Sequence, residues 1–99
     1  MGTIEWLPIA ENDVRRIYYY IAIDNEQAAE NLVRRIHAKL ETCLTFPRTG
    51  RARPQFGEGV RSASVGNFLV FYRAIPDGIR VLRLLDGRRD LDDAFFRED

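Results

Sequence analysis

The sequence of 99 residues predicts an α+β fold, in which a helical hairpin packs on a small antiparallel sheet in the order β-α-α-β-β-β. Two observations predict it. In the first half, apolar residues recur twice at the spacing of one helical face. In the second half, runs rich in β-branched and aromatic residues alternate with short turn signals. We expect one domain over residues 1–99, because a chain of this length lies at the lower end of the domain range.

The first half contains a short strand and two helices. Residues 3–6, with the sequence TIEW, form the predicted strand. The first helix covers residues 10–22, where apolar or aromatic side chains lie at positions 10, 14, 17, 18, 21 and 22. The second helix carries a similar stripe over residues 29–44, with Asp24 as its expected N-cap and Gln27 completing a capping box. Because the break between the helices is short, they should form an antiparallel hairpin.

The second half contains a loop and three strands. Residues 46–59 are rich in glycine, proline and arginine and lack periodicity, so we expect a loop there. The strand-like runs cover residues 60–65, 68–75 and 79–85. A Gly-Asn pair and a Pro-Asp-Gly turn separate them, which predicts an antiparallel meander. Residues 90–99 should form either a short helix or a frayed tail.

The net charge is zero, but the charges are unevenly distributed. Residues 1–46 carry five basic and seven acidic side chains, residues 47–89 nine arginines and three acids, and residues 90–99 one arginine and five acids. The three segments therefore carry −2, +6 and −4. We expect a cationic surface on the sheet-forming half and an acidic tail that can fold back over it. The flat guanidinium group of arginine favours bidentate contacts, so this surface should bind partners that carry carboxylates or phosphates.

Few residues offer metal, cofactor or nucleophilic chemistry. The single histidine, His37, and the single cysteine, Cys43, lie on the same predicted helix and give no zinc-ligand spacing. No P-loop or dinucleotide fingerprint occurs, so we expect neither a metal nor a cofactor. The sequence shows no signal peptide, and no apolar run approaches the roughly 18 residues of a membrane span. We therefore expect a soluble cytoplasmic protein without a membrane partner.

One face of the predicted sheet has no covering element. Two helices can cover only one face, so the other should present apolar side chains beside arginines, and exposed patches of this kind bind partners. The residues expected on that face are Leu69, Phe71 and Arg73 on one strand and Leu82 and Leu84 on the next. The alternative is that the loop at 46–59 and the C-terminal tail cover it.

The run IYYYI at residues 17–21 is a second candidate surface. Tyr18 falls on the buried stripe, whereas Tyr19 and Tyr20 point towards other faces. Either these two side chains pack against the sheet edge or a loop, or they contribute to a partner surface, where amphipathic aromatic residues are favoured.

An arginine group is the third candidate feature. Its members are Arg51, Arg53, Arg61, Arg73, Arg83, Arg88 and Arg89. For Arg88 and Arg89, which Asp86 and Asp90 flank, a salt-bridged turn, protein docking and phosphate contact all remain open. A ribonuclease would use such arginines to stabilise developing charge. It would also need a proton donor and acceptor, and only Tyr72 and the acids are nearby.

Four motifs are the most specific parts of a similarity that covers about residues 4–91: YIAIDNEQAA, P-x-x-G-R, VGNFLVFYR and LRLLDGRRDL. Together they resemble the ParE branch of the ParE/RelE toxin superfamily, the toxins of bacterial type II toxin–antitoxin modules. The resemblance implies a compact RelE/ParE-like fold and a ParD-like antitoxin that wraps the toxin in a hetero-oligomer. It also implies an action on DNA gyrase, because ParE-type toxins trap gyrase on cleaved DNA. The ParE-type toxins are not themselves known as enzymes. RelE-type relatives instead cut messenger RNA on the ribosome.

The terminal motif departs from the family pattern H-G-x-R-D, because Asp86 replaces the histidine. This replacement removes an acid/base group and adds a negative charge beside Arg88. It therefore weighs against a nuclease.

The favoured hypothesis is a non-enzymatic toxin that inhibits DNA gyrase by direct binding and does not itself read nucleic acid. The expected target-docking residues are Arg61, Arg83, Arg88 and Arg89. The expected antitoxin-binding residues are Tyr19, Tyr20, Leu69, Phe71, Arg73, Leu82 and Leu84. The first alternative is a RelE-like, ribosome-dependent endoribonuclease with catalytic candidates Arg61, Tyr72, Arg83 and Arg88. The second is an attenuated toxin that only binds its antitoxin.

Overall fold

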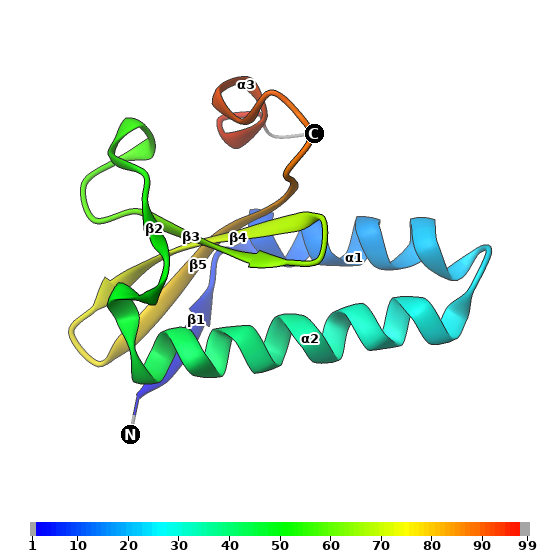
Figure 1. The fold of residues 1–99 in the computed structure, drawn as a ribbon, viewed down its shortest axis with the longest axis horizontal. Coiled ribbons are helices and arrows are strands. Elements are labelled where there is room, and N and C mark those ends of the chain that lie inside the picture. Colours follow the sequence, from blue (N-terminus) through cyan, green and yellow to red (C-terminus); the bar gives the residue numbers. More distant parts are fainter. Residues whose placement is uncertain (1, 98–99) are drawn as a thin grey trace.

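A computed structural model describes residues 2–97 and confirms the α+β class and the predicted order of the main elements (Figure 1). The strands are β1 (Thr3–Trp6), β2 (Arg51–Ala52), β3 (Arg61–Val65), β4 (Phe68–Ile75) and β5 (Gly78–Asp86). The helices are α1 (Pro8–Ala22), α2 (Glu26–Thr45) and α3 (Leu91–Phe95). The C-terminal segment thus contains the short helix that was one of the two expectations, and residues 98–99 lie outside the described residues.

The helical hairpin forms as predicted, with small differences at the helix starts. α1 begins at Pro8, two residues earlier than expected, because proline fits the first helical position, where no N–H is needed. The N-cap of α2 is Asn25, whose side-chain oxygen accepts a hydrogen bond from the Ala28 N–H at 3.0 Å. The predicted cap at Asp24 was therefore wrong by one residue. α1 and α2 lie side by side and antiparallel (Figure 1).

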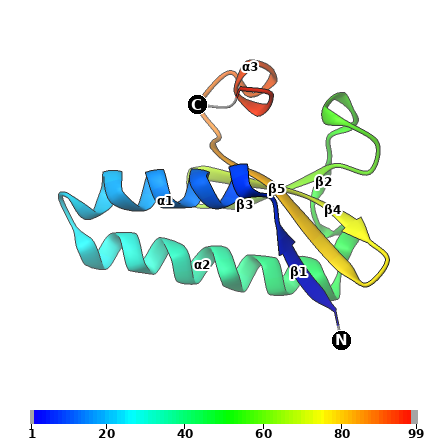
Figure 2. The ribbon, with the colours of Figure 1, turned by 180° about the vertical axis from the view of Figure 1, so that it is seen from behind.

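The sheet has the strand order β1-β5-β4-β3-β2. Strands β2 to β5 pair antiparallel, whereas β1 runs parallel to β5, beside which it lies in Figure 2. A Cβ atom at Gly78 would lie only 1.9 Å from the Thr3 carbonyl oxygen, so glycine allows these two strands to approach. The parallel pairing of β1 and the two-residue strand β2 are features that the sequence pattern did not predict.

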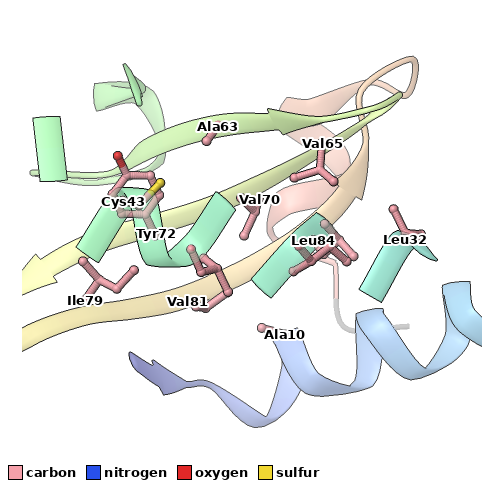
Figure 3. Packing of buried hydrophobic residues seen from close by; sticks show 12 residues of the cluster. Ala10, Leu32, Cys43, Ala63, Val65, Val70, Tyr72, Ile79, Val81 and Leu84 are labelled. Atoms are coloured by element: carbon pink, nitrogen blue, oxygen red, sulfur yellow. The ribbon is translucent and has the colours of Figure 1, made fainter. Parts of the chain in front are cut away.

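A helix-side core fills the space between the helical hairpin and one face of the sheet (Figure 3). Its buried members are Ala10, Leu32, Ile36, Leu40, Cys43, Ala63, Val65, Val70, Tyr72, Ile79, Val81 and Leu84. The α2 members follow the predicted helical stripe, and the strand members alternate along β3 and β4. This core therefore forms on the face that the amphipathic pattern predicts.

The other face of the sheet is covered, which corrects the expectation of an open apolar face. An outer-face cluster there consists of the buried residues Phe56, Val60, Phe71, Leu82, Leu85 and Ala94. Phe71 is 0% exposed and Leu82 is 7% exposed, because the 46–59 segment and α3 pack over them. Figure 1 shows α3 on the side of the sheet opposite α2. The alternative that the loop and the tail cover this face is the one the structure supports.

A β-bulge in β5 corrects the position of Leu84. Tyr72 pairs with Val81, but Phe71 pairs with Arg83, so Leu82 is an extra residue on β5. A bulge of this kind reverses the alternation of side chains beyond it. As a result, Leu84 lies in the helix-side core and is 1% exposed, rather than sharing the outer face with Leu82.

Candidate protein-docking surface

Arg83 is a buried structural residue, which contradicts its predicted exposure at a docking or catalytic surface. Its side chain is 4% exposed, and its partner Asp13 on α1 is 2% exposed. Nε donates to Asp13 Oδ2 at 2.8 Å and Nη2 donates to Oδ1 at 2.9 Å. The Leu84 N–H donates to the same carboxylate at 3.0 Å. The carboxylate therefore joins α1 to β5 and neutralises the arginine.

The remaining nitrogen of Arg83 holds the C-terminal end of α3. Nη1 donates to the carbonyl oxygens of Ala94, Phe95 and Arg97, at 3.0, 2.8 and 2.6 Å. The last carbonyls of a helix have no partner within the helix, and a cation there is also favoured by the helix dipole. Arg83 thus fixes α3 over the outer-face cluster.

Arg61 and Tyr72 lie next to each other and anchor the segment that follows α2. Arg61 Nη1 donates to the Gly50 carbonyl at 2.7 Å. The Tyr72 hydroxyl accepts from the Gly50 N–H at 2.9 Å and donates to the Pro47 carbonyl at 2.8 Å. Burial raises the pKa of Tyr72 to about 12, so its hydroxyl stays protonated near neutral pH. Arg61 is half-buried, and both residues have structural partners.

The four ribonuclease candidates are not assembled at one place. Arg61 pairs in register with Tyr72, whose ring is in the helix-side core, whereas Arg83 pairs with Phe71 of the outer-face cluster. Arg88 follows the far end of β5. Tyr72 pairs with Val81, which lies five residues before the last residue of β5. Tyr72 is therefore separated by roughly 16 Å along the strand from the end of β5 that Arg88 follows.

The turn after β5 presents Arg88 in a fixed position. Nε and Nη2 of Arg88 donate to the two oxygens of Asp86 at 3.0 and 2.8 Å, and the Arg88 N–H donates at 2.9 Å. These hydrogen bonds lower the pKa of Asp86 to about 2. The Gly87 N–H donates to the Asn67 carbonyl at 2.8 Å, which ties the turn to the β3–β4 turn. Arg88 nevertheless remains 73% exposed, so the salt-bridged turn still offers a guanidinium to a partner.

Arg89 is the exposed neighbour of this ion pair. Within residues 2–97 it forms no salt bridge, because Asp86 pairs with Arg88 and Asp90 has a different role. The Asp90 carboxylate accepts from the Asp93 N–H at 3.3 Å as the N-cap of α3. Of the two aspartates that flank the arginine pair, only Asp86 forms a salt bridge with it within residues 2–97.

The predicted antitoxin-binding residues divide by exposure. Tyr19 is 63% exposed and Tyr20 is 79% exposed, so neither is packed against the sheet. Arg73 is also exposed, and Leu69 is half-buried. The other three residues of that set, Phe71, Leu82 and Leu84, are buried as described above.

A groove of about 550 Å³ lies between α1 and the place where the β3–β4 turn meets the turn after β5. We call the latter, which carries Arg88 and Arg89, the arginine turn. Ile17 and Tyr20 of α1 form one wall, and Phe68 and Leu84 line the opposite side. Three arginines also line it, namely Arg16, Arg88 and Arg89. Both residues of the arginine pair therefore border an apolar groove on the side of α1.

Two structural contributions were missed at the sequence level. Asp13 lies between Ala10 and Val14 on the apolar stripe of α1, and a carboxylate in that position is a signal for a buried cation. Phe56 lies in the segment expected to be an irregular loop, yet it is 7% exposed and stacks on Phe95 at a centroid distance of 4.4 Å. An aromatic residue among glycines, prolines and arginines was the available signal.

Two further properties concern residues 2–97 alone. In that range, no helix combines the length and the apolar character that crossing a bilayer requires. The same described residues contain no group of three His, Cys, Asp or Glu side chains placed to bind a metal ion.

Comparison with known proteins places the fold and the sequence in one family. Residues 4–91 match the family described as "ParE toxin of type II toxin-antitoxin system, parDE". Toxin ParE3 of Caulobacter vibrioides is 30% identical over 92 residues, which is 92% of each chain. Toxin ParE1 of Mycobacterium tuberculosis is 35% identical over 65 residues, which is 65% of this chain and 66% of the relative.

A solved structure supports the same assignment at the level of the fold. The structure described as "Chromosomal ParDE TA system from P. aeruginosa" is similar with a TM-score of 0.69 and 24% identity, over 87% of this chain and 96% of that chain. The family match covers most of the sequence, including the helical hairpin and the arginine turn. The chain therefore belongs to the ParE toxin family of type II toxin–antitoxin systems.

Proposed function

We propose that this ParE-family toxin inhibits DNA gyrase by direct protein binding, without catalysis, and that a ParD-like antitoxin neutralises it in a cytoplasmic hetero-oligomer. The toxin's own side of the gyrase contact is the arginine turn, with Arg88 and Arg89 as the docking residues. Both are exposed, and the ion pair with Asp86 fixes the guanidinium of Arg88. An arginine fixed in this way loses little conformational entropy on binding.

The burial of Arg83 is the observation that carries the non-catalytic proposal. A ribonuclease of the RelE type would need arginine charge at the reacting phosphate. Arg83 instead donates its hydrogen bonds to Asp13 and to the carbonyls at the end of α3. With Arg61 bound to the Gly50 carbonyl, two of the three arginine candidates already serve the fold.

The antitoxin is proposed to bind the exposed members of its predicted set. Tyr19 and Tyr20 present aromatic rings with hydroxyl groups, a combination favoured at interfaces. Arg73 adds an exposed guanidinium over the outer face, where it donates a 3.4 Å hydrogen bond to the Glu58 carbonyl. Phe71, Leu82 and Leu84 are not direct contacts in this proposal, because they are buried in the toxin itself.

Expression of the toxin alone in bacteria tests this function. Gyrase trapped on cleaved DNA would stop division without stopping growth in cell length, so we expect growth arrest with filamentation and a DNA-damage response. Co-expression of the antitoxin should restore growth. Messenger RNA cut at ribosome-dependent sites would contradict the proposal in favour of the endoribonuclease alternative, and unaffected growth would favour the attenuated toxin.

A further inference from the structure

The groove between α1 and the arginine turn has a mixed chemical character. The half-buried apolar side chains of Ile17 and Phe68 form its floor and walls, together with the buried side chain of Leu84. Arg16 lies at its α1 edge, and Arg88 and Arg89 lie at the opposite edge. An apolar strip bordered on both sides by arginines matches a segment that has an apolar face and acidic flanks.

The acidic residues at the groove do not cancel this positive edge. Asp13 accepts both of its ion-pair hydrogen bonds from Arg83 and also lies 3.9 Å from Nη2 of Arg16, and Asp86 accepts both of its own from Arg88. Within residues 2–97 Arg89 has no salt-bridge partner. A partner carboxylate would therefore meet Arg89 without displacing an existing ion pair.

The length of the groove indicates the form of its occupant. On the α1 side the lining residues run from Asp13 to Ile21 at helical spacing, and eight steps of 1.5 Å give about 12 Å. This length accommodates about two turns of a second helix. A helix that lies in such a groove uses anchors at i, i+3 or i+4 and i+7.

We infer that this groove binds about two turns of an acidic amphipathic helix on the toxin's target protein. The inference rests on the proposed function, in which that target is DNA gyrase. A stable antitoxin complex needs an interface of roughly 800 Å² on each partner. Two helical turns supply less than this, so the groove suits a recognition segment of the target better than the main antitoxin contact.

Nucleic acid suits the groove less well than a peptide does. Phosphate binding gains its free energy from cations that neutralise many phosphates along a backbone. Here Arg88 is already paired with Asp86, and the floor is made of aliphatic and aromatic side chains. A helix with an apolar face would remove that floor from water, whereas a sugar-phosphate backbone would not.

Two substitutions test the groove without disturbing the core. Arg89→Glu reverses an exposed edge charge, and Tyr20→Ala removes a side chain that is 79% exposed. The matched controls are Arg51→Glu on β2 and Phe46→Ala at the end of α2, where Phe46 is 64% exposed. All four purified toxins should keep the wild-type melting temperature, because none of the four side chains is buried.

The measurement is inhibition of DNA supercoiling by the gyrase holoenzyme, together with the affinity of each toxin for its antitoxin. We expect each groove variant to need about tenfold more toxin for half inhibition, the loss expected of a contact at the edge of a hot spot. The controls should inhibit like the wild type, and antitoxin affinity should change by less than about threefold in Arg89→Glu and in both controls. Tyr20→Ala should weaken antitoxin binding as well, because Tyr20 is also a proposed antitoxin contact. Folded groove variants that inhibit gyrase normally, or an Arg89→Glu toxin that loses antitoxin and gyrase binding equally, would overturn the inference.

A cross-linking arm identifies the occupant. A photoreactive p-benzoylphenylalanine in place of Tyr20 should cross-link the toxin to a helical segment of gyrase that carries acidic residues. Cross-links to a basic segment, to DNA or to the antitoxin alone would overturn the inference. If the wild-type toxin leaves gyrase unaffected, the proposed function fails, and growth arrest by the same variants still decides the role of the groove. Loss of arrest only in the groove variants would support it, and unchanged arrest would overturn it.

Discussion

Arg83 and Asp13, 70 positions apart in the sequence, form a two-point ion pair in the interior between β5 and α1. Removing one partner of a buried pair leaves the other charge without compensation, which costs about 3–5 kcal/mol. We therefore expect Arg83→Ala and Asp13→Ala each to lower the free energy of unfolding by about that amount. Urea denaturation of the purified toxin measures it.

The exposed ion pair between Arg80 and Glu5 provides the matched control. Its side chains are 36% and 49% exposed, so Arg80→Ala should change the free energy of unfolding by only about 0–1 kcal/mol. Equal effects of Arg83→Ala and Arg80→Ala would contradict the structural role of Arg83. A loss of toxicity in Arg83→Ala should accompany the loss of stability, rather than occur in a fully folded protein.

Tyr72 predicts a loss of stability at alkaline pH. Its pKa is about 12 in the folded protein, above the ordinary value of 10.0, so folding favours the protonated form. This contribution is fully present below pH 10 and is lost as the pH rises from about 10 to 12, and a shift of this size corresponds to roughly 2–3 kcal/mol. Denaturation at pH 9 and pH 12 should show a smaller loss in Tyr72→Phe than in the wild type.

The Tyr72→Phe variant also has an expected cost at neutral pH. The hydroxyl accepts from Gly50 and donates to Pro47, and its loss leaves a backbone N–H and a carbonyl without that partner. The cost of such unpaired groups is about 1–3 kcal/mol. If the variant and the wild type lose stability in parallel between pH 9 and pH 12, Tyr72 is not the group responsible.

The cover over the outer-face cluster depends on Phe95. Its ring stacks on Phe56 at 4.4 Å and meets Phe71 edge-on at 5.3 Å, although the side chain is only half-buried. Truncation of a fully buried phenylalanine to alanine lowers the free energy of unfolding by about 3–5 kcal/mol. Because Phe95 is only half-buried, Phe95→Ala should lower it by about 2 kcal/mol. Phe96 is 66% exposed, and Phe96→Ala should cost less than about 1 kcal/mol.

Thermal unfolding and binding of an apolar dye to the native state check the Phe95 prediction. Phe95→Ala should melt at a lower temperature and bind more dye, because Phe56 and Phe71 become accessible. Identical behaviour of the Phe95 and Phe96 variants would mean that α3 does not protect the cluster.

Asp86 predicts a separate effect at acid pH. Its pKa is lowered to about 2 by hydrogen bonds from Arg88, so folding favours the ionised form. The resulting stabilisation is present above an ordinary pKa of 3.8 and is lost as the pH falls towards 2. Between pH 4 and pH 2, Asp86→Asn should therefore lose less stability than the wild type in urea denaturation, and a larger loss would contradict the assignment.

The sequence predicted the architecture well because each element carries its own local signal. The helical stripes of α1 and α2 and the turns that bound β4 each depend on neighbouring residues. The bulge in β5 depends on how β4 and β5 pair, and no local pattern marks Leu82 as the extra residue. The alternation assumed through β5 therefore placed Leu84 on the wrong face.

The candidate site was harder to predict for a related reason. The seven members of the arginine group lie in the second half of the sequence, but their roles differ by long-range contacts. Arg83 meets Asp13 across most of the chain, and Arg61 meets the Gly50 carbonyl beyond the end of α2. Arg88 was predicted more accurately, because its partner Asp86 is two residues away. Local ion pairs are visible in a sequence, and distant ones are not.

An assay with purified toxin and purified DNA gyrase decides whether the toxin acts on gyrase by direct binding. We expect the toxin to stop supercoiling and to cause cleaved DNA to accumulate, and equimolar antitoxin to prevent both effects. Gyrase that supercoils normally in a large excess of folded toxin would contradict the account, above all if the same toxin cleaves messenger RNA on ribosomes.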